Sequence, residues 1–283
     1  ANMVQGELGV GPCEVASTAG VCVSGVTALR YAFNGLRANP DIHYAVATGS
    51  ELASTFLYAR YCGGKMVFHH STEELEAQPE LAFNADFLRW MLSDGAGALV
   101  LASSPAPGKL SLRIDWIDIH SYSHEYEACM FAGANKGEDG KLLSWRLFSP
   151  QSEESMQALR VKQDVRLLNE QIVYVCVDRA LRASIAKHGL TPDQIQYFLP
   201  HYSSEYFRDK IYQHMAGIGF EIPYDRWFTN LTTCGNTGSA SIYIILDELY
   251  HSGRLKPGDR LLCFVPESGR FTIAYMLLTV VEN

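Results

Sequence analysis

The sequence predicts an α/β protein in which helices cover the faces of sheets. Three observations support this fold class. Apolar segments of strand length alternate with amphipathic segments of helix length, and turns rich in Gly and Ala separate them. The composition is that of a globular protein, with 47% hydrophobic and 19% charged residues. A chain of 283 residues is long enough for one large domain or two smaller halves.

The first third of the chain contains a cysteine between a predicted strand and a predicted helix. Residues 14–19 are predicted to form a buried strand that ends in a tight turn, and residues 24–38 a helix. Asn39 ends this helix, because a residue that precedes proline avoids the α region. A second buried strand is predicted at 43–52, and 90–104 predict a turn rich in Gly and Ala that leads into a third.

The middle of the chain contains a long strand, a polar connection and an amphipathic segment. Side chains alternate over 110–123, as in a strand, and the Gly-, Glu- and Lys-rich residues 124–152 predict a loop or lid. One helix is expected over about 153–188, because apolar residues recur there near helical spacing. Its charged face is expected to meet solvent.

The last third predicts a short strand, a helix and two closing strands. Thr191 and Pro192 suit the N-cap and the first position of a helical turn, after which a short strand ends at His201. Residues 232–255 predict a Gly-rich turn followed by a helix. Residues 258–281 predict two strands around a Gly turn.

Charge and hydropathy exclude several classes of protein. The net charge of −8 argues against nucleic acid as the main partner, because phosphate binding needs a basic face. No membrane span is expected, since no apolar run approaches the roughly 18–20 residues that a span needs. Seven cysteines at irregular spacings, without a CxxC pair, argue against a disulfide framework or a zinc site. We therefore expect no metal, and reduced thiols in a cytoplasm.

Three turns place a reactive or hydrogen-bonding side chain after a predicted strand. Cys22 lies where a helix begins, and helix N–H groups lower the pKa of a nearby thiol. His201 follows the short strand, and Asn236 lies in CGNTGSAS. Each has a structural alternative: an inert buried thiol, a hydrogen-bonded polar side chain, and an Asn in a left-handed turn. Together, a Cys nucleophile, a His that exchanges protons and an Asn donor are typical of acyl transfer.

Five segments occur in the order of a known family's motifs: AGVCVSGVTAL, LSDGAGALVL, YFLPHYSS, GNTGSASI and ESGRFT. They resemble those of β-ketoacyl-acyl-carrier-protein synthase III, and the resemblance extends from about Val15 to Val281. That family belongs to the thiolase-fold condensing enzymes, so the resemblance implies a layered α–β–α–β–α fold. It also implies three parts: 1–110 as the remainder of the N-terminal half with the nucleophile, 111–165 as a connection or lid-like segment, and 166–283 as the C-terminal half.

The resemblance implies that two acyl thioesters are condensed. Cys22 would take an acyl group from coenzyme A or acyl carrier protein, and a malonyl- or β-ketoacyl-thioester would then form a carbon–carbon bond with it. His201 and Asn236 would donate hydrogen bonds to the thioester carbonyl of this second substrate. The backbone N–H groups of Cys22 and Gly269 would form the oxyanion hole. No cofactor is expected beyond the carriers, and a cytoplasmic homodimer that binds acyl carrier protein or acyl-CoA is implied.

Several features depart from the family's pattern. The usual His-Gln-Ala-Asn becomes His-Tyr-Ser-Ser from His201 on, and Arg270 brings a cation to a turn that usually holds three glycines. Residues 120–165 are longer and more polar than the family's connection and could reshape the acyl tunnel. Glu51 is either a second acid–base group or a hydrogen-bonded structural residue. The candidate substrate-site residues are Glu51, Ser203, Ser204 and Arg270.

Much of the family's N-terminal region, including most of its first strand–helix unit, has no counterpart ahead of Cys22. We therefore expect a fragment, either cleaved or completed by a separate N-terminal polypeptide. The residues after His201 and the larger segment 120–165 favour an enzyme of specialised metabolism that joins two acyl chains into a dialkylresorcinol-, cyclohexanedione- or pyrone-type product. The alternatives are a fatty-acid-initiating synthase III and a catalytically silent partner subunit or acyl-binding protein.

Overall fold

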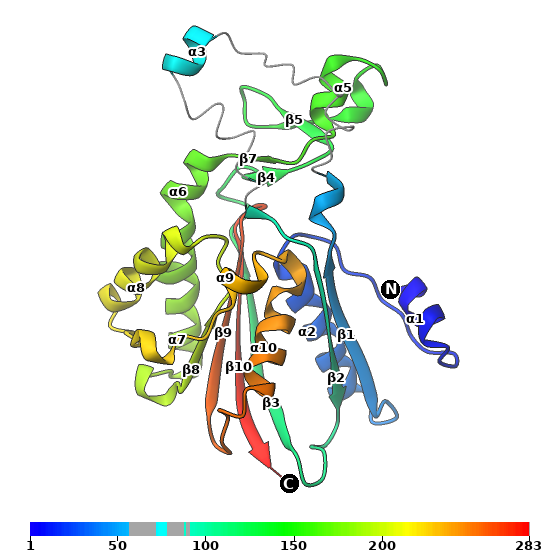
Figure 1. Ribbon diagram of the computed structural model, residues 1–283, viewed down its shortest axis with the longest axis vertical. Helices are drawn as coiled ribbons and strands as arrows, with labels where there is room; N and C mark the ends of the chain where they lie inside the picture. The colour runs from blue at the N-terminus through cyan, green and yellow to red at the C-terminus, as the bar shows by residue number, and fades with distance from the viewer. Residues whose placement is uncertain (57–71, 78–87, 89–90, 283) are drawn as a thin grey trace.

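Two sheets, with helices between and beside them, form the body of the protein (Figure 1). The computed structural model describes residues 1–56, 72–77, 88 and 91–282. The larger sheet has the strand order β3–β10–β9–β8. Its strands are β3 (Leu110–Ser121), β8 (Tyr197–Pro200), β9 (Arg260–Glu267) and β10 (Thr272–Glu282). Strand β8 runs parallel to β9, and the other neighbours are antiparallel.

The smaller sheet pairs β1 (Tyr44–Glu51) with β2 (Gly95–Ala102) in an antiparallel register. Helices α2 (Val23–Ala38) and α10 (Ser241–His251) pack between the two sheets, as Figure 1 shows. On the other face of the larger sheet lie α6 (Val165–Val173), a π-helical stretch (Tyr174–Leu181), α7 (Arg182–His188) and α8 (Arg208–Gly217). The layers therefore follow the order helix, sheet, helix, sheet, which are four of the five layers of the predicted α–β–α–β–α fold; no described helix covers the outer face of the smaller sheet.

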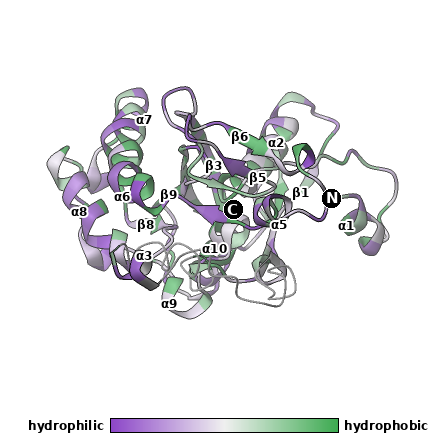
Figure 2. Ribbon diagram, turned by 90° about the horizontal axis from the view of Figure 1, so that it is seen from above, coloured by the Kyte–Doolittle hydropathy of each residue, from purple (hydrophilic) through white to green (hydrophobic). Residues whose placement is uncertain are grey.

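The larger sheet is buried on both faces, which is why β9 and β10 are almost continuously apolar. Phe198, Phe264 and Tyr275 point toward α6–α8, whereas Leu199 and Cys263 point toward α2 and α10. The outermost helix, α8, is mostly hydrophilic (Figure 2). Because this sheet is packed on both faces, the ends of β8 and β9 are held in place; His201 follows the end of β8, and Gly269 follows the end of β9.

The elements predicted at 24–38, 110–123 and 258–281, and the short strand predicted to end at His201, are confirmed in type, with ends shifted by a few residues. Thr191 is the N-cap of a 3₁₀ turn that begins at Pro192, as predicted, and Gln194, which was not singled out, completes a capping box with Thr191. Helix α2 ends with Asn39 in an extended conformation, which agrees with the effect of the following proline.

The predicted buried strand at 14–19 is wrong. These residues have no strand partner in the described chain and are mostly exposed, so nothing holds them in a ladder. Strands β1 and β2 exist, but the prediction that 43–52 is buried holds for one face alone. The cross-strand pair Val46 and Val100 is 52% and 72% exposed, because no described element covers the outer face of this sheet.

The single helix expected over 153–188 is also wrong. Short helix α5 (Glu153–Ala158) ends before β7 (Lys162–Gln163), and α6 starts afresh after Asp164. Asp164 is the N-cap of α6, since its carboxylate accepts the N–H of Leu167 at 3.0 Å. The apolar pattern continues through this region, but the chain leaves the helical conformation after α5, and Asp164 caps a new helix.

The segment 124–165 forms a small structured region rather than a plain loop. It contains the two-stranded pairs β4 (Met130–Phe131) with β7, and β5 (Ala134–Lys136) with β6 (Leu142–Ser144). Figure 1 shows it beyond the end of the larger sheet at which β9 turns into β10. Short elements complete the description: α1 (Asn2–Leu8), α3 (Thr72–Ala77) and α9 (Leu231–Cys234). Among the helices that the structure describes, none is long and apolar enough to cross a membrane.

Candidate active site

Cys22 occupies the N-cap position of α2, as the sequence predicts, and is half-buried. Burial raises the pKa of its thiol well above the ordinary value, and the nearby carboxylates of Glu267 and Glu51 raise it further. The expectation that the helix start lowers this pKa is therefore wrong for the unliganded protein. The raised pKa favours the thiol form of Cys22 over the thiolate.

His201 follows β8, and its backbone N–H donates to the carbonyl of Phe264 at 2.8 Å. The side chain is buried, and burial lowers its pKa to about 4, so the imidazole is neutral at pH 7. No described residue forms a hydrogen bond with the ring. A neutral ring nitrogen is therefore available to donate to a bound oxygen.

Asn236 is buried in the turn before α10. Its carbonyl oxygen accepts the N–H of Ser93 at 2.8 Å, and its side-chain Oδ1 accepts the N–H of Gly238 at 3.1 Å. The left-handed alternative is wrong, because Phe271 is the one described non-glycine residue with a positive φ. The bond to Oδ1 leaves the Nδ2 group without an acceptor among the described residues, as a donor to substrate requires.

Close packing brings the Asn236 turn onto the helix that begins at Cys22. A Cβ atom on Gly25 or on Gly49 would lie 2.1 or 2.3 Å from the carbonyl oxygen of Ser239. Only glycine permits this approach of α2 and β1 to the same peptide group. The Asn236 turn and the start of α2 are thereby held together.

Glu51, at the end of β1, supports the same turn. Its Oε2 accepts the N–H of Ser239 at 3.2 Å, and the Ser239 hydroxyl donates to the carbonyl of Ser50 at 3.0 Å. Glu51 thus has the hydrogen-bonded structural placement that the sequence left open, and its charge also acts on Cys22.

Glu267 was not singled out by the sequence, yet it lies against Cys22. Its Oε2 accepts the N–H groups of Val21 and Val23, each at 3.0 Å. A charged residue at the end of the apolar strand LLCFVP was the available signal. Gly269, two residues on, would place a Cβ 3.2 Å from Val21. In the described chain the N–H groups of Cys22 and Gly269 have no oxygen acceptor, as expected for an oxyanion hole.

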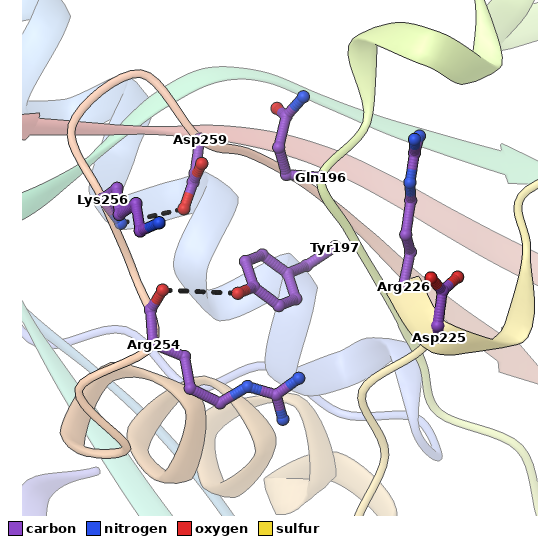
Figure 3. A pocket seen from close by; sticks show the side chains of 7 residues that line it. All are labelled: Gln196, Tyr197, Asp225, Arg226, Arg254, Lys256 and Asp259. Atoms are coloured by element: carbon purple, nitrogen blue, oxygen red, sulfur yellow. Dashed lines mark hydrogen bonds between the residues drawn. The ribbon is translucent and has the colours of Figure 1, made fainter.

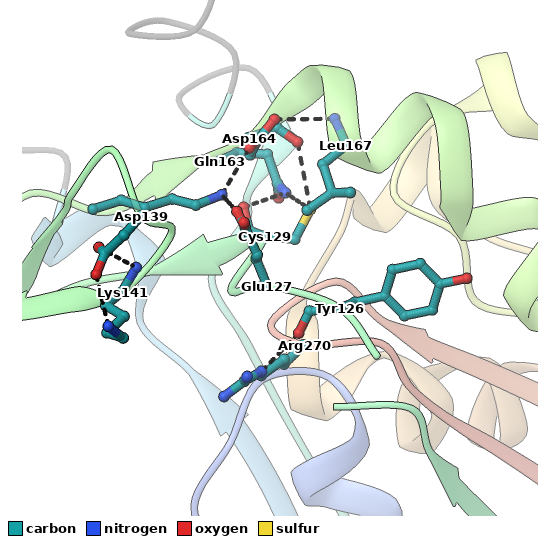
Figure 4. A network of polar contacts seen from close by, with 10 residues as sticks. Tyr126, Glu127, Cys129, Asp139, Lys141, Gln163, Asp164, Leu167 and Arg270 are labelled. Atoms are coloured by element: carbon teal, nitrogen blue, oxygen red, sulfur yellow. Dashed lines mark hydrogen bonds and ion pairs between the residues drawn. The ribbon is translucent and has the colours of Figure 1, made fainter. Parts of the chain in front are cut away.

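The segment 124–165 holds the turn that contains Gly269 (Figure 4). The Gly269 carbonyl accepts the N–H of Cys129 at 2.9 Å, and the Ser268 hydroxyl donates to Oε1 of Gln163 at 3.1 Å. Arg270 is exposed, and its Nε donates to the carbonyl of Tyr126 at 2.8 Å. The guanidinium that was expected near the substrate pocket therefore fastens the turn to this segment.

The two serines after His201 have different placements. Ser204 is the N-cap of a 3₁₀ turn, where its hydroxyl accepts the N–H of Tyr206 at 3.2 Å. Ser203 lines a small, mostly apolar cavity with Ile172 and Pro266. Ser204 is thus engaged in local structure, whereas Ser203 faces apolar space beside the His201 turn.

A larger cavity of about 320 Å³ lies at the opposite end of β8 (Figure 3). Its lining is polar and consists of Gln196, Tyr197, Asp225, Arg226, Arg254, Lys256 and Asp259. Tyr197 begins β8, whereas His201 follows its end. This cavity is therefore separate from the Cys22 site.

The comparisons with known proteins agree with this geometry. The family model described as "3-Oxoacyl-[acyl-carrier-protein (ACP)] synthase III C terminal" matches residues 185–278. The β-ketoacyl-acyl-carrier-protein synthase III of Clostridium beijerinckii is 29% identical over 191 residues, which are 66% of this chain and 51% of the relative. The enzyme of the same name from Chlamydia pneumoniae is 30% identical over 178 residues, 61% of this chain and 46% of the relative. The chain thus spans about half the length of these curated relatives.

Solved structures share the fold over nearly the whole chain. OleA from Xanthomonas campestris aligns with a TM-score of 0.74 and 21% identity, over 99% of this chain and 69% of OleA. FabH from Pseudomonas aeruginosa gives 0.70 and 18%, over 100% of this chain and 72% of FabH. The tetronic acid condensing enzyme AbyA1 gives 0.71 and 16%, over 99% and 73%. The chain is therefore a synthase III-like protein that has the thiolase fold of these condensing enzymes.

Proposed function

We propose that the protein is a ketosynthase-type condensing enzyme that joins two acyl thioesters through Cys22. One observation carries this proposal. The half-buried thiol of Cys22 at the start of α2, the buried neutral His201 after β8 and the Asn236 amide with a free Nδ2 before α10 lie on segments that contact one another at one end of the larger sheet. An inert buried cysteine would need neither of the other two groups.

The first step is thioester exchange. Sγ of Cys22 attacks the carbonyl carbon of an acyl-CoA or acyl-carrier-protein thioester, and the carrier sulfur leaves with the thiol proton. Negative charge develops on the carbonyl oxygen, where the N–H groups of Cys22 and Gly269 would stabilise it. The loss of one such donor typically costs about 3–4 kcal/mol of transition-state stabilisation. Neither carrier is a resident cofactor: each enters with its acyl group as a substrate and leaves as a free thiol.

The second step forms the carbon–carbon bond. A malonyl- or β-ketoacyl-thioester becomes an enolate, by loss of CO₂ in the malonyl case and by loss of an α-proton to water in the β-ketoacyl case, and its carbon attacks the acyl group on Cys22. The sulfur of Cys22 is the leaving group. His201 and Asn236 would donate hydrogen bonds to the enolate oxygen. His201 suits this role because its pKa of about 4 keeps it neutral and able to donate without a buried positive charge.

Joining two acyl chains in specialised lipid or polyketide biosynthesis is the favoured form of this reaction. The segment 124–165 contacts the Gly269 turn directly, and Ser203 faces an apolar cavity, so both departures from the family pattern lie beside the site. The likeness to AbyA1, a tetronic acid condensing enzyme, supports this form. The likeness to FabH supports the fatty-acid-initiating alternative.

Intact-mass measurement tests the proposal. The protein is incubated with acyl-CoA and acyl-carrier-protein thioesters of several chain lengths, and then with malonyl- or β-ketoacyl-thioesters. We expect an acyl adduct that Cys22→Ala abolishes and Cys234→Ala retains, followed by its release as a condensed product. The mass of that product separates chain joining from fatty-acid initiation. No adduct with any thioester would favour the silent partner subunit.

A further inference from the structure

The peptide groups on both sides of Cys22 share one acceptor. Glu267 ends β9, and its Oε2 accepts the N–H of Val21 and the N–H of Val23, each at 3.0 Å. These residues lie more than 240 positions away in sequence, so the contact joins the last hairpin to the start of α2. In the part of the chain that the structure describes, no Lys, Arg or His pairs with this carboxylate.

Helix starts leave N–H groups without partners, and a local Ser, Thr or Asp usually accepts one of them. Cys22 at the N-cap makes no such side-chain hydrogen bond. Glu267 instead accepts the first and third of three successive N–H groups, those of residues 21 and 23. The middle N–H, that of Cys22, is left for a ligand. Of these three N–H groups, only that of Cys22 has no hydrogen bond to Glu267 and can donate to a ligand.

We propose that Glu267 is the positioning residue of the nucleophile: it fixes the two peptide groups that flank Cys22, and so orients both the thiol and the N–H of Cys22 toward a bound acyl group. This inference rests on the proposed role of Cys22. Glu267 itself touches no reacting atom in this scheme, and its action passes through the backbone of residues 21–23.

The proposal has an electrostatic consequence. The charged groups that face Cys22 are Glu267 at the end of β9 and Glu51 at the end of β1, both negative, while the buried His201 is neutral at pH 7. Burial raises the pKa of the Glu267 carboxyl, and the N–H groups of Val21 and Val23 partly offset this rise. A negative charge beside a thiol disfavours the thiolate. Removal of the Glu267 charge must therefore lower the pKa of Cys22.

Two substitutions separate the hydrogen bonds from the charge. Glu267→Gln keeps a carbonyl oxygen that can accept both N–H groups but removes the charge, whereas Glu267→Ala removes both. Glu170→Gln, on an exposed face of α6, is the control for net charge. Iodoacetamide alkylation of each variant is followed from pH 6 to pH 10 by peptide mass, and the exposed Cys13 serves as the internal reference. Acylation of Cys22 by acyl-CoA is measured in parallel.

We expect Glu267→Gln to shift the alkylation profile of Cys22 to lower pH. The rate below the midpoint should rise about three- to fourfold for each unit by which the pKa falls, because the thiolate fraction grows tenfold while its nucleophilicity declines. Acylation should stay within about threefold of wild type in Glu267→Gln and fall at least about tenfold in Glu267→Ala. The Cys13 profile and the Glu170→Gln variant should match wild type.

The proposal is overturned if the Cys22 profile of Glu267→Gln overlays that of wild type, or if Glu267→Gln loses as much acylation as Glu267→Ala. It is also overturned if Glu267→Ala acylates normally. Should Glu267→Ala fail to fold, as thermal unfolding would reveal, the Glu267→Gln profile still decides. If no thioester acylates wild-type Cys22, the proposed function fails, and with it the role of Glu267 toward an acyl group; a shifted alkylation profile would then show only that the Glu267 charge acts on the thiol. If wild-type Cys22 is acylated but the Glu267 variants behave as wild type, the positioning role fails and the proposed function stands.

Discussion

Two glycines on one helix offer a matched test of how the site is held together. In α2, a Cβ on Gly25 would lie 2.1 Å from the carbonyl oxygen of Ser239, whereas a Cβ on Gly35 would meet nothing within 4 Å. Ordinary contact begins at 3.4 Å, so Gly25→Ala must move the Ser239 peptide or the helix by about 1.3 Å. Ser239 belongs to the turn of Asn236, and α2 begins at Cys22.

Both substitutions gain about 0.5–1 kcal/mol from the better helix propensity of alanine. For Gly25→Ala, overpacking costs about 1–3 kcal/mol, so we expect a net loss near 1–2 kcal/mol in the free energy of unfolding. A misplacement of about 1 Å between catalytic groups can cost about a hundredfold in rate, so condensation should fall by about that factor. Gly35→Ala should be slightly more stable than wild type and equally active.

Urea unfolding measures the stability difference, and mass spectrometry separates Cys22 acylation from the condensation that needs Asn236. If Gly25→Ala matches Gly35→Ala in both unfolding midpoint and condensation rate, then the close approach to Ser239 does not hold the site together, and the packing argument is wrong.

Three further outcomes follow from buried polar groups. Burial lowers the pKa of His201 from 6.5 to about 4 in the folded protein, so the free energy of unfolding should decrease as the pH falls below 6.5. Urea unfolding of wild type at pH 7 and pH 5 measures this decrease, and in His201→Asn the decrease should be smaller by about 2 kcal/mol. Gln163→Met deprives the Ser268 hydroxyl of its acceptor and should cost roughly 1–3 kcal/mol by the same assay, with slower Cys22 acylation. Burial raises the pKa of Asp118, but hydrogen bonds from Lys187 and His188 outweigh this effect and hold the pKa below its ordinary value. Asp118→Asn should therefore cost roughly 1.5–3 kcal/mol at pH 7, and less in acid, because the contribution of the carboxylate to stability is lost as the pH falls through its folded-state pKa.

Local signals predicted much of the fold. The apolar runs of β9 and β10, the N-cap Thr191 with Pro192 and the proline after Asn39 each act within a few residues, so the sequence displays them. The failures depend on distant partners. Residues 14–19 have strand-like side chains but no ladder in the described chain, and a strand exists only with its neighbour.

The candidate site also combines residues that local motifs indicate with a residue that only distant contacts reveal. The motifs around Cys22, His201 and Asn236 are local in sequence, so the sequence indicates all three as candidate site residues. Glu267 could not be found in that way, because its partners are two backbone N–H groups at the far end of the sequence. The direction of the Cys22 pKa was likewise hidden, since it is set by burial and by carboxylates brought in from β9 and β1.

The turn of residues 268–270 touches Cys22's neighbours on one side and the segment 124–165 on the other. A substitution in that outlying segment can therefore reach the backbone beside Cys22 through the hydrogen bonds that join the segment to this turn. Surface connections accept sequence change more readily than buried sheets do. The segment is thus a place where sequence change can alter the surroundings of Cys22 while the sheets and their buried side chains remain constant.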